Sequence, residues 1–479
     1  MNHRLDADVV VVGCGPVGVM AALRCVQRGL RVIAVDRSTE IYPLPRALGM
    51  DDEVQDVFAR AGLLDALREY SVPLPGGEFV NAAGERVVGI ELPEGTLGSL
   101  GHPPVVTFNQ PGIEAALRAA AVDAGVDMRL GLDAFAVTDM GEAVRLDVTD
   151  DSGAVTINAR WLIAADGAKS TVRSLRGLAM IDQGFDQTWL VVDTTLRDPD
   201  LPLPHLARQI CDPARVCTIV PGPGAHRRWE FQLQDHEDRE QMLADEVIAD
   251  LLAPWGTPHQ LQIDRAAVYR FHATVAERFR DGQVFLAGDA AHQMPPFNGQ
   301  GMCTGIRDAE NLAWKLAHVT QGLADPAILD TYDEERRPHA ADQVEHSVDA
   351  GLLMQAIAHD GEAALESGYG QRPFPKLAGS GFQVGHDAVG TVVPNPGGPR
   401  SPVVDGWTVL VAQERPCVAD ALTAIGGVIA PVGADDYPGL VDVSSAVVVR
   451  PDRYIAAVTN DLESAVAATV AWATTGGHA

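Results

Sequence analysis

A glycine-rich turn near the start of the chain joins an apolar segment to a helical one. Residues 8–12 suit a buried strand, residues 13–18 follow with the sequence GCGPVG, and residues 16–28 have helical character that ends at Gly29. A second apolar run at 31–35 completes a strand–helix–strand unit. Such a unit requires a parallel sheet with a crossover helix. The chain is therefore predicted to be an α/β protein with a Rossmann-like domain.

The glycines of this turn lie where a bound dinucleotide requires them. Gly13 permits the tight turn, Gly15 lets the backbone approach a pyrophosphate, and Gly18 lets helix and strand pack closely. The start of the helix offers free N–H groups to the phosphates. Asp36 ends the second strand, where its carboxylate can bind ribose hydroxyls. Because FAD and NAD(P) share this motif, it predicts a dinucleotide without choosing between them.

A second motif has the sequence ADGAKSTVR at residues 165–173. A strand ends in Asp166 and Gly167, and Ser170 and Arg173 follow. Two interpretations stay open at this point. The segment can be a cofactor-binding turn, or a structural turn in which the aspartate caps the next helix.

A third motif occupies residues 282–305, GQVFLAGDAAHQMPPFNGQGMCTG. A buried strand ends in Gly288 and Asp289, two prolines follow, and a glycine-rich stretch leads into a helix over about 301–320. The aspartate can bind a ribityl or ribose hydroxyl. Backbone N–H groups of residues 299–303 can point at the N1–C2=O edge of a flavin, and a helix N-terminus aimed there favours the anionic reduced ring. This motif predicts a flavin.

Charge and cysteine usage exclude several classes of protein. The net charge of −29 argues against nucleic acid and anionic membrane as partners. No apolar run approaches the ~20 residues of a membrane span, and the start of the chain lacks the pattern of a signal peptide. The six cysteines include no C-x-x-C pair, so neither a metal site nor a disulfide framework is expected. A cytoplasmic location is the simplest expectation.

The pattern changes along the chain in a way that suggests several domains. Alternating segments at 189–195 and 228–233 predict an antiparallel sheet, and the proline- and glycine-rich stretch 394–402 predicts a linker. The expected divisions are 1–180, the first part of an FAD-binding domain with interleaved segments; 181–275, a β-sheet substrate domain; 276–385, the second part of the FAD-binding domain and a helical segment; and 400–479, a small third domain.

In their order and spacing, the three motifs resemble the group A flavoprotein aromatic hydroxylases, typified by para-hydroxybenzoate hydroxylase. The nearer resemblance is to the branch that hydroxylates 3-(3-hydroxyphenyl)propionate, phenol and aromatic polyketides. It rests on YPLPRA at 42–47, FNQPG at 108–112 and GQGM at 299–302. The resemblance covers roughly residues 5–345, and the third domain resembles the thioredoxin-like tail of some members.

The resemblance implies roles for individual residues. Asp36 would bind the adenosine ribose, Arg46 and Gln110 the phosphate and ribityl groups, and Asp166 both FAD and the nicotinamide coenzyme. The Pro296 carbonyl would face the substrate near the reactive flavin carbon. The full set of expected cofactor contacts is Gly13, Gly15, Pro16, Val17, Gly18, Asp36, Arg37, Arg46, Gln110, Asp166, Gly288, Asp289, Pro296, Gly299, Gly301, Met302 and Cys303.

Three aromatic residues, Trp189, Phe231 and Phe297, are candidates for an apolar substrate pocket, with core packing as the alternative for the first two. His292 is expected to be structural, and no catalytic base is identified. Cys417 has no second cysteine near it in the sequence, so redox activity of the tail is not expected.

The resemblance also implies a reaction. NADPH or NADH would bind transiently and reduce FAD, O2 would give a C4a-hydroperoxyflavin, and a small aromatic substrate would be hydroxylated. The absence of a second Rossmann fingerprint fits transient binding. A Baeyer–Villiger oxygenase or epoxidase acting on a polyketide is an alternative with the same cofactor, and a non-catalytic FAD-binding escort protein is an alternative of another class. A homodimer is left open as an assembly.

Overall fold

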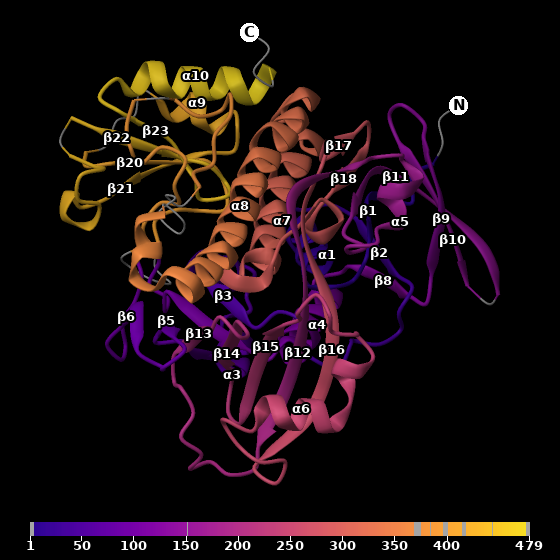
Figure 1. Cartoon of the computed structure of the whole chain (residues 1–479). Coiled ribbons are helices and arrows are strands. Elements are labelled where there is room, and N and C mark those ends of the chain that lie inside the picture. Colours follow the sequence, from indigo (N-terminus) through magenta and orange to yellow (C-terminus); the bar gives the residue numbers. More distant parts are fainter. Residues whose placement is uncertain are drawn as a thin grey trace.

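In the computed structural model, two eight-stranded sheets and a small C-terminal sheet surround two long helices, α7 (Gln300–Thr320) and α8 (Asp330–Asp360) (Figure 1). The structure describes residues 4–150, 152–367, 375–383, 385–395, 401–413, 418–442 and 444–475. No helix within these ranges is both long and apolar enough to cross a membrane.

The first sheet holds the glycine motif at its centre. β1 lies between β2 and β11 and runs parallel to both. The order is β17 (Arg280–Asp281), β18 (Val284–Leu286), β11 (Gly153–Ala164), β1 (Ala7–Val12), β2 (Val32–Asp36) and β8 (Asp127–Leu130), with β10 (Val144–Asp150) and β9 (Asp133–Asp139) added beside β11. The crossover helix α1 (Pro16–Gln27) is almost fully buried and packs against α7. The predicted Rossmann-like unit is confirmed.

The second sheet is largely antiparallel and carries the expected substrate domain. Its order is β19 (His292–Gln293), β16 (Leu261–Ala276), β12 (Met180–Leu196), β15 (His226–Gln232), β14 (Cys217–Pro221), β13 (Ala207–Cys211), β5 (Gly76–Asn81) and β6 (Arg86–Glu91). The expected range 181–275 leaves out β5 and β6, which come from the N-terminal part of the chain. β13 and β5 pair in parallel, and β6 forms the edge of the sheet.

The two faces of this sheet have different neighbours because side chains alternate along each strand. Leu190 and Phe231 are paired across β12 and β15 and pack against α6 (Asp245–Leu252). Trp189 and Val191 point to the other face. There, Trp189 joins a cluster with Met354 of α8.

The C-terminal domain is a small mixed sheet with two helices. β20 (Thr408–Val411) pairs in parallel with β21 (Val428–Pro431) and antiparallel with β22 (Ala446–Val449), which pairs with β23 (Ile455–Thr459). α9 (Ala419–Thr423) joins the first two strands, and α10 (Leu462–Thr475) follows the last. This arrangement is the one expected of a thioredoxin-like domain. Cys417 and the centre of the predicted 394–402 linker lie outside the described residues.

A smaller three-stranded sheet connects the first two. β7 (Val105–Phe108) lies between β3 (Gly49–Asp51) and β4 (Ser71–Pro73). Two helices near it begin at polar caps. Asp51 accepts the Val54 N–H at the start of α2 (Asp52–Arg60), and Asn109 accepts the Gly112 N–H at the start of α4 (Gln110–Asp123). The shorter helix α3 (Leu64–Tyr70) packs against β4, whereas α5 (Thr171–Leu175) packs against β9 of the first sheet.

Candidate functional site

The glycine loop has the shape that a pyrophosphate requires. A Cβ at Gly13 would lie 2.3 Å from the carbonyl oxygen of Ala165, and one at Gly18 would lie 1.9 Å from the carbonyl oxygen of Gly13. A Cβ at Gly15 would meet no atom within 4 Å. The loop is therefore closed toward the protein and open at Gly15, where α1 begins without a side-chain cap. The free N–H groups there suit the phosphates of FAD.

Asp36 ends β2 and contacts the glycine loop directly. Its Oδ2 accepts the Cys14 N–H at 2.6 Å, and its Oδ1 accepts the Ser38 N–H at 2.7 Å. Arg37 is exposed beside it. Sequence reasoning missed Arg118 of α4, which donates from Nε to the Cys14 carbonyl at 3.1 Å. A guanidinium beside the phosphate-binding loop of a chain this acidic is a candidate phosphate contact.

Gln110 holds the loop that carries Arg46. Its Oε1 accepts N–H bonds from Arg46 and Ala47, both at 2.8 Å. Arg228 of β15 donates to the carbonyls of Arg46 and Pro45, at 2.8 and 2.7 Å. The substrate sheet therefore fixes a loop of the expected FAD site.

The second motif forms a capped turn. Asp166 accepts bonds from the Ser170 hydroxyl and the Val172 N–H, so both of its oxygens are used at the start of α5. This is the structural interpretation of the motif, and a further contact of Asp166 with FAD stays a prediction. Arg173 donates to the Ala290 carbonyl at 2.9 Å and so joins the second motif to the third.

The third motif is built on a buried ion pair. Asp308 of α7 accepts a bond from the Gly288 N–H at 3.0 Å and contacts His292 Nε2 at 2.7 Å and Arg336 Nε at 2.9 Å. Burial opposes ionisation of Asp308, but the charges and hydrogen bonds of His292 and Arg336 outweigh it and lower the pKa of the carboxyl. His292 is fully buried. Its role is to hold the Gly288 turn, as expected from the sequence.

Two features of this motif fit the rest of a flavin dinucleotide. Asp289 is exposed. The protein atoms around its carboxyl nevertheless desolvate it and raise its pKa, although the charges of His292 and Arg46 act in the opposite direction. No hydrogen bond joins this carboxylate to another described residue, so it can accept one from a hydroxyl of the cofactor. Gly288 lies in the left-handed region at φ 61°, and a Cβ there would press on Val17 of the glycine helix at 3.1 Å.

α7 begins where the flavin ring is expected. Gly299 has φ 65°, and no side chain caps the helix, so its first N–H groups, at Gln300, Gly301 and Met302, are available. Pro296 begins the one-turn helix just before them. Burial raises the pKa of the Cys303 thiol. The N–H of Cys303 falls within the hydrogen-bonded part of α7, so its expected backbone contact with the flavin stays a prediction.

An aromatic wall adjoins this turn. The ring centroid of Phe297 lies 5.1 Å from that of Trp189 and 6.1 Å from that of Phe271. Phe231 does not belong to this wall. It lies on the opposite face of the sheet and packs against Trp255, because its neighbour in β15, Glu230, takes the position on the Trp189 face. Of the two interpretations of Phe231, pocket lining and core packing, the structure shows core packing.

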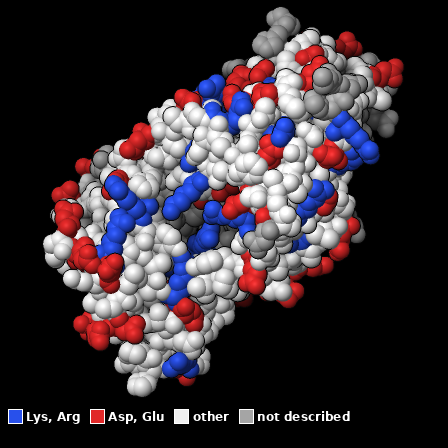
Figure 2. Space-filling view, turned by 90° about the vertical axis from the view of Figure 1, so that its right-hand side faces the viewer, with Lys and Arg blue, Asp and Glu red and all other residues white. Residues whose placement is uncertain are grey.

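The charge on the surface is unevenly distributed. Figure 2 shows one face on which Lys and Arg side chains gather around a central hollow, with a few Asp and Glu side chains beside it and more of them toward the edge of the face. In a chain of net charge −29, such a gathering favours an anionic ligand in the hollow.

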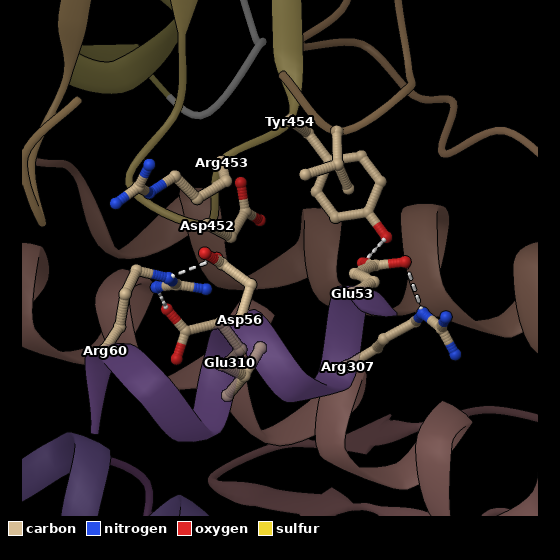
Figure 3. A pocket seen from close by; sticks show the side chains of 10 residues that line it. Glu53, Asp56, Arg60, Arg307, Glu310, Asp452, Arg453 and Tyr454 are labelled. Atoms are coloured by element: carbon tan, nitrogen blue, oxygen red, sulfur yellow. Dashed lines mark hydrogen bonds and ion pairs between the residues drawn. The ribbon is translucent and has the colours of Figure 1, made fainter. Parts of the chain in front are cut away.

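A separate small cavity lies between α2, α7 and the C-terminal domain (Figure 3). Its volume of about 10 Å³ leaves room for a single water molecule. The side chains around it form hydrogen bonds with one another; Glu53, for example, accepts hydrogen bonds from Tyr454 and Arg307. This cavity belongs to the docking of the C-terminal domain and has no room for a substrate.

Comparisons with known proteins agree with this site. A model of the FAD binding domain family matches residues 6–347. The chain is 35% identical over 392 residues to a probable NADH-specific resorcinol 4-hydroxylase of Rhodococcus jostii, covering 78% of this chain and 73% of that protein. It is 34% identical over 359 residues to a 3-(3-hydroxyphenyl)propionate/3-hydroxycinnamic acid hydroxylase of Mycolicibacterium smegmatis, covering 74% of this chain but only 62% of that enzyme.

The fold is also that of a solved hydroxylase. The structure of aklavinone-11 hydroxylase with FAD and aklavinone superposes with a TM-score of 0.83 at 22% identity, over 98% of this chain and 99% of the other. The likeness extends to the C-terminal domain. Three motifs, one fold and a matched family model lead to the same conclusion: the chain belongs to the FAD-binding family of aromatic hydroxylases and is an FAD-dependent monooxygenase.

Proposed function

We propose that the protein hydroxylates a phenolic or polyketide aromatic ring with electrons from NADH or NADPH and oxygen from O2. The observation that carries the proposal is the position of Phe297. It directly follows Pro296, two residues before the turn at Gly299 that opens α7, and its ring contacts Trp189. One short loop therefore carries both a residue of the aromatic wall and a row of free N–H groups.

The residues of this chain have distinct tasks in such a reaction. The N–H groups of Gly301 and Met302 would hold the flavin ring, and the wall of Trp189, Phe271 and Phe297 would orient the substrate ring and exclude water. FAD, when bound, supplies the redox chemistry between the nicotinamide donor and O2. The Pro296 carbonyl would face the substrate.

The relatives suggest which donor and which phenols to test first. One is described as NADH-specific and acts on resorcinol, and another acts on 3-(3-hydroxyphenyl)propionate. Both are phenols, which supports the phenolic substrate class. We therefore expect NADH to be the better donor.

The test is NAD(P)H oxidation by the yellow holoenzyme over a panel of phenols, phenylpropionates and polyketide aromatics. Hydroxylation predicts a product 16 mass units heavier than its substrate, with the new hydroxyl on the ring by NMR. A Baeyer–Villiger oxygenase would give a lactone or ester and an epoxidase an epoxide, both distinguishable by NMR. A non-catalytic FAD-binding protein would show no substrate-dependent oxidation. A purified chain without flavin, and unable to take it up, would contradict the proposal.

A further inference from the structure

Glu230 is a buried carboxylate on the face of the sheet that carries the aromatic wall. It lies opposite Val191 in the pairing of β12 and β15, two pairs away from Trp189 and Gln232. Side chains two apart on a strand share a face, so Glu230 and Trp189 point the same way. Only 6% of Glu230 is exposed. No side-chain hydrogen bond from a described residue contributes to its pKa, and its carboxylate oxygens are not among the fully enclosed atoms without a partner, so they keep a small contact with solvent.

The nearby cations and hydroxyls are already committed to other groups. Arg228, on the same face, donates to Asp193 and to the loop carbonyls of Pro45 and Arg46. Asp193 also contacts His226 and Arg265. The Thr218 hydroxyl, opposite Glu230 on β14, donates to Gln209. Largely buried carboxylates in proteins are normally paired or hydrogen-bonded. Glu230 has only its small contact with solvent, so a ligand hydroxyl that replaced the water there would supply the missing hydrogen bond.

Glu230 lies between two loops of the expected FAD site. On one side, two residues along β15, Arg228 holds the loop of Arg46. On the other side, Trp189 contacts Phe297 beside the α7 N-terminus. Residues two apart on a strand are separated by about 7 Å. Glu230 therefore lies between the loop of Arg46 and the aromatic wall, on the face of the sheet that carries both contacts.

We propose that Glu230 accepts a hydrogen bond from the hydroxyl of a phenolic substrate and takes its proton as the ring is hydroxylated. This inference rests on the proposed function. The O–H bond breaks, its electron pair stays on the phenol oxygen, and the ring becomes a better nucleophile for the oxygen atom that the monooxygenase reaction supplies. When the attacked ring carbon loses its own hydrogen as a proton to water, aromaticity returns and the carboxylic acid gives its proton back to the phenol oxygen.

The charges around Glu230 suit a base. Burial raises the pKa of Glu230 to about 6, with Arg228 opposing the shift and Asp193 adding to it. His226 and Arg265 also face Asp193 from β15 and β16. The carboxylate is thus ionised at neutral pH and more basic than an ordinary one, which favours general-base catalysis.

The experiment compares wild-type holoenzyme with Glu230→Gln, using resorcinol and 3-(3-hydroxyphenyl)propionate as probes. The amide keeps the shape of the side chain but cannot take a proton. We expect kcat to fall roughly a hundredfold and the rise of kcat/KM on the acid side of the pH profile to disappear. Glu91→Gln, an exposed carboxylate of the same sheet, is the matched control and should keep both.

A second probe separates chemistry from folding. A nitro-substituted resorcinol, already ionised at the assay pH, needs no base, so Glu230→Gln should lose little activity with it. Glu230→Asp should retain part of the activity on resorcinol. An unchanged kcat and pH profile in Glu230→Gln would overturn the inference and leave the proposed function standing. If wild type turned over none of these phenols, the phenolic substrate class itself would fail.

Discussion

The hydroxyl of Tyr454 donates a 2.6 Å hydrogen bond to Oε1 of Glu53 and so joins the C-terminal domain to α2 (Figure 3). The other carboxylate oxygen accepts from Arg307 Nε at 2.7 Å. Arg307 also donates to Gln300, the first residue of α7, at 3.0 Å. Polar contacts therefore run from the C-terminal domain to the turn where the flavin ring is expected.

Tyr454→Phe should loosen this connection without changing the packing. Glu53 would lose a buried partner, and a hydrogen bond to a charged group contributes about 2 kcal/mol. We expect a lower melting temperature and faster loss of FAD on dilution, measured by thermal unfolding and by the rise of free-flavin fluorescence.

Tyr437 provides a matched control in the same domain. It is fully buried, and its hydroxyl has no hydrogen-bond partner among the described residues. Tyr437→Phe removes the same atom and should leave stability unchanged or slightly raised. Equal losses of stability in the two variants would show that the hydrogen bond from Tyr454 to Glu53 does not stabilise the protein.

Gly15→Ala should block FAD binding while preserving the fold. The backbone at Gly15 is extended, with φ −76°, and a Cβ there meets no protein atom. The methyl group would occupy the space expected for the pyrophosphate. We expect a normal melting temperature for the apoprotein and FAD affinity at least about tenfold weaker, since ~1.4 kcal/mol of lost contact is a factor of ten. Titration of the apoprotein with FAD measures it.

Gly18→Ala is the contrasting variant. A Cβ at Gly18 would lie 1.9 Å from the Gly13 carbonyl oxygen, so α1 would have to move away from β1. This variant should lose stability before FAD is added. If Gly15→Ala unfolded as readily as Gly18→Ala, the open space at Gly15 would not be a ligand site.

Glu310→Gln should destabilise the whole molecule. Glu310 of α7 is almost fully buried. Its carboxylate contacts Arg24 and Arg28 of α1 at 2.8 Å and Arg60 of α2 at 2.6 Å. Losing its charge leaves three guanidinium groups with one fewer anion, and breaking such a buried cluster costs about 3–5 kcal/mol. Chemical unfolding measures the loss.

Asp65→Asn is the control for Glu310→Gln, because Asp65 forms an exposed ion pair with Arg68. Exposed pairs contribute about 0–1 kcal/mol. A small effect of Glu310→Gln, similar to that of Asp65→Asn, would mean that Asp405, the second anion near Arg24 and Arg60, compensates for it.

The sequence predicts the local parts of the FAD site because each motif is continuous. Helices expected at 16–28 and 301–320 are observed at Pro16–Gln27 and Gln300–Thr320. Glycine, helix and strand signals of this kind depend on neighbours in the chain.

Long-range features were harder to predict for physical reasons. The strands Gly76–Asn81 and Arg86–Glu91 join a sheet whose other strands lie beyond residue 180, and no local pattern encodes that pairing. Phe231 was assigned to the pocket because it is aromatic, but the alternation in Arg228-Trp229-Glu230-Phe231 gives two faces without saying which one meets the flavin. Pairing with β12 decides it and places Glu230 there.

Glu230 should also lower the stability of the protein wherever it is ionised. Its pKa in the folded state is about 6, above the value of ~4.3 for an unfolded glutamate. Between these values the folded state binds more protons than the unfolded state, so stability falls as the pH rises. The loss is complete above pH 6 and amounts to about 2 kcal/mol, at ~1.36 kcal/mol per pKa unit.

Glu230→Gln removes this loss because the amide has no proton to release. At pH 8 we expect the variant to melt a few degrees above wild type, and at pH 4.5, where wild-type Glu230 is protonated in the folded state, we expect the two to melt together. Differential scanning calorimetry of both proteins across this range measures the difference. A variant that is more stable yet less active is what a functional carboxylate predicts, whereas a residue that only supports the fold would lose stability at every pH.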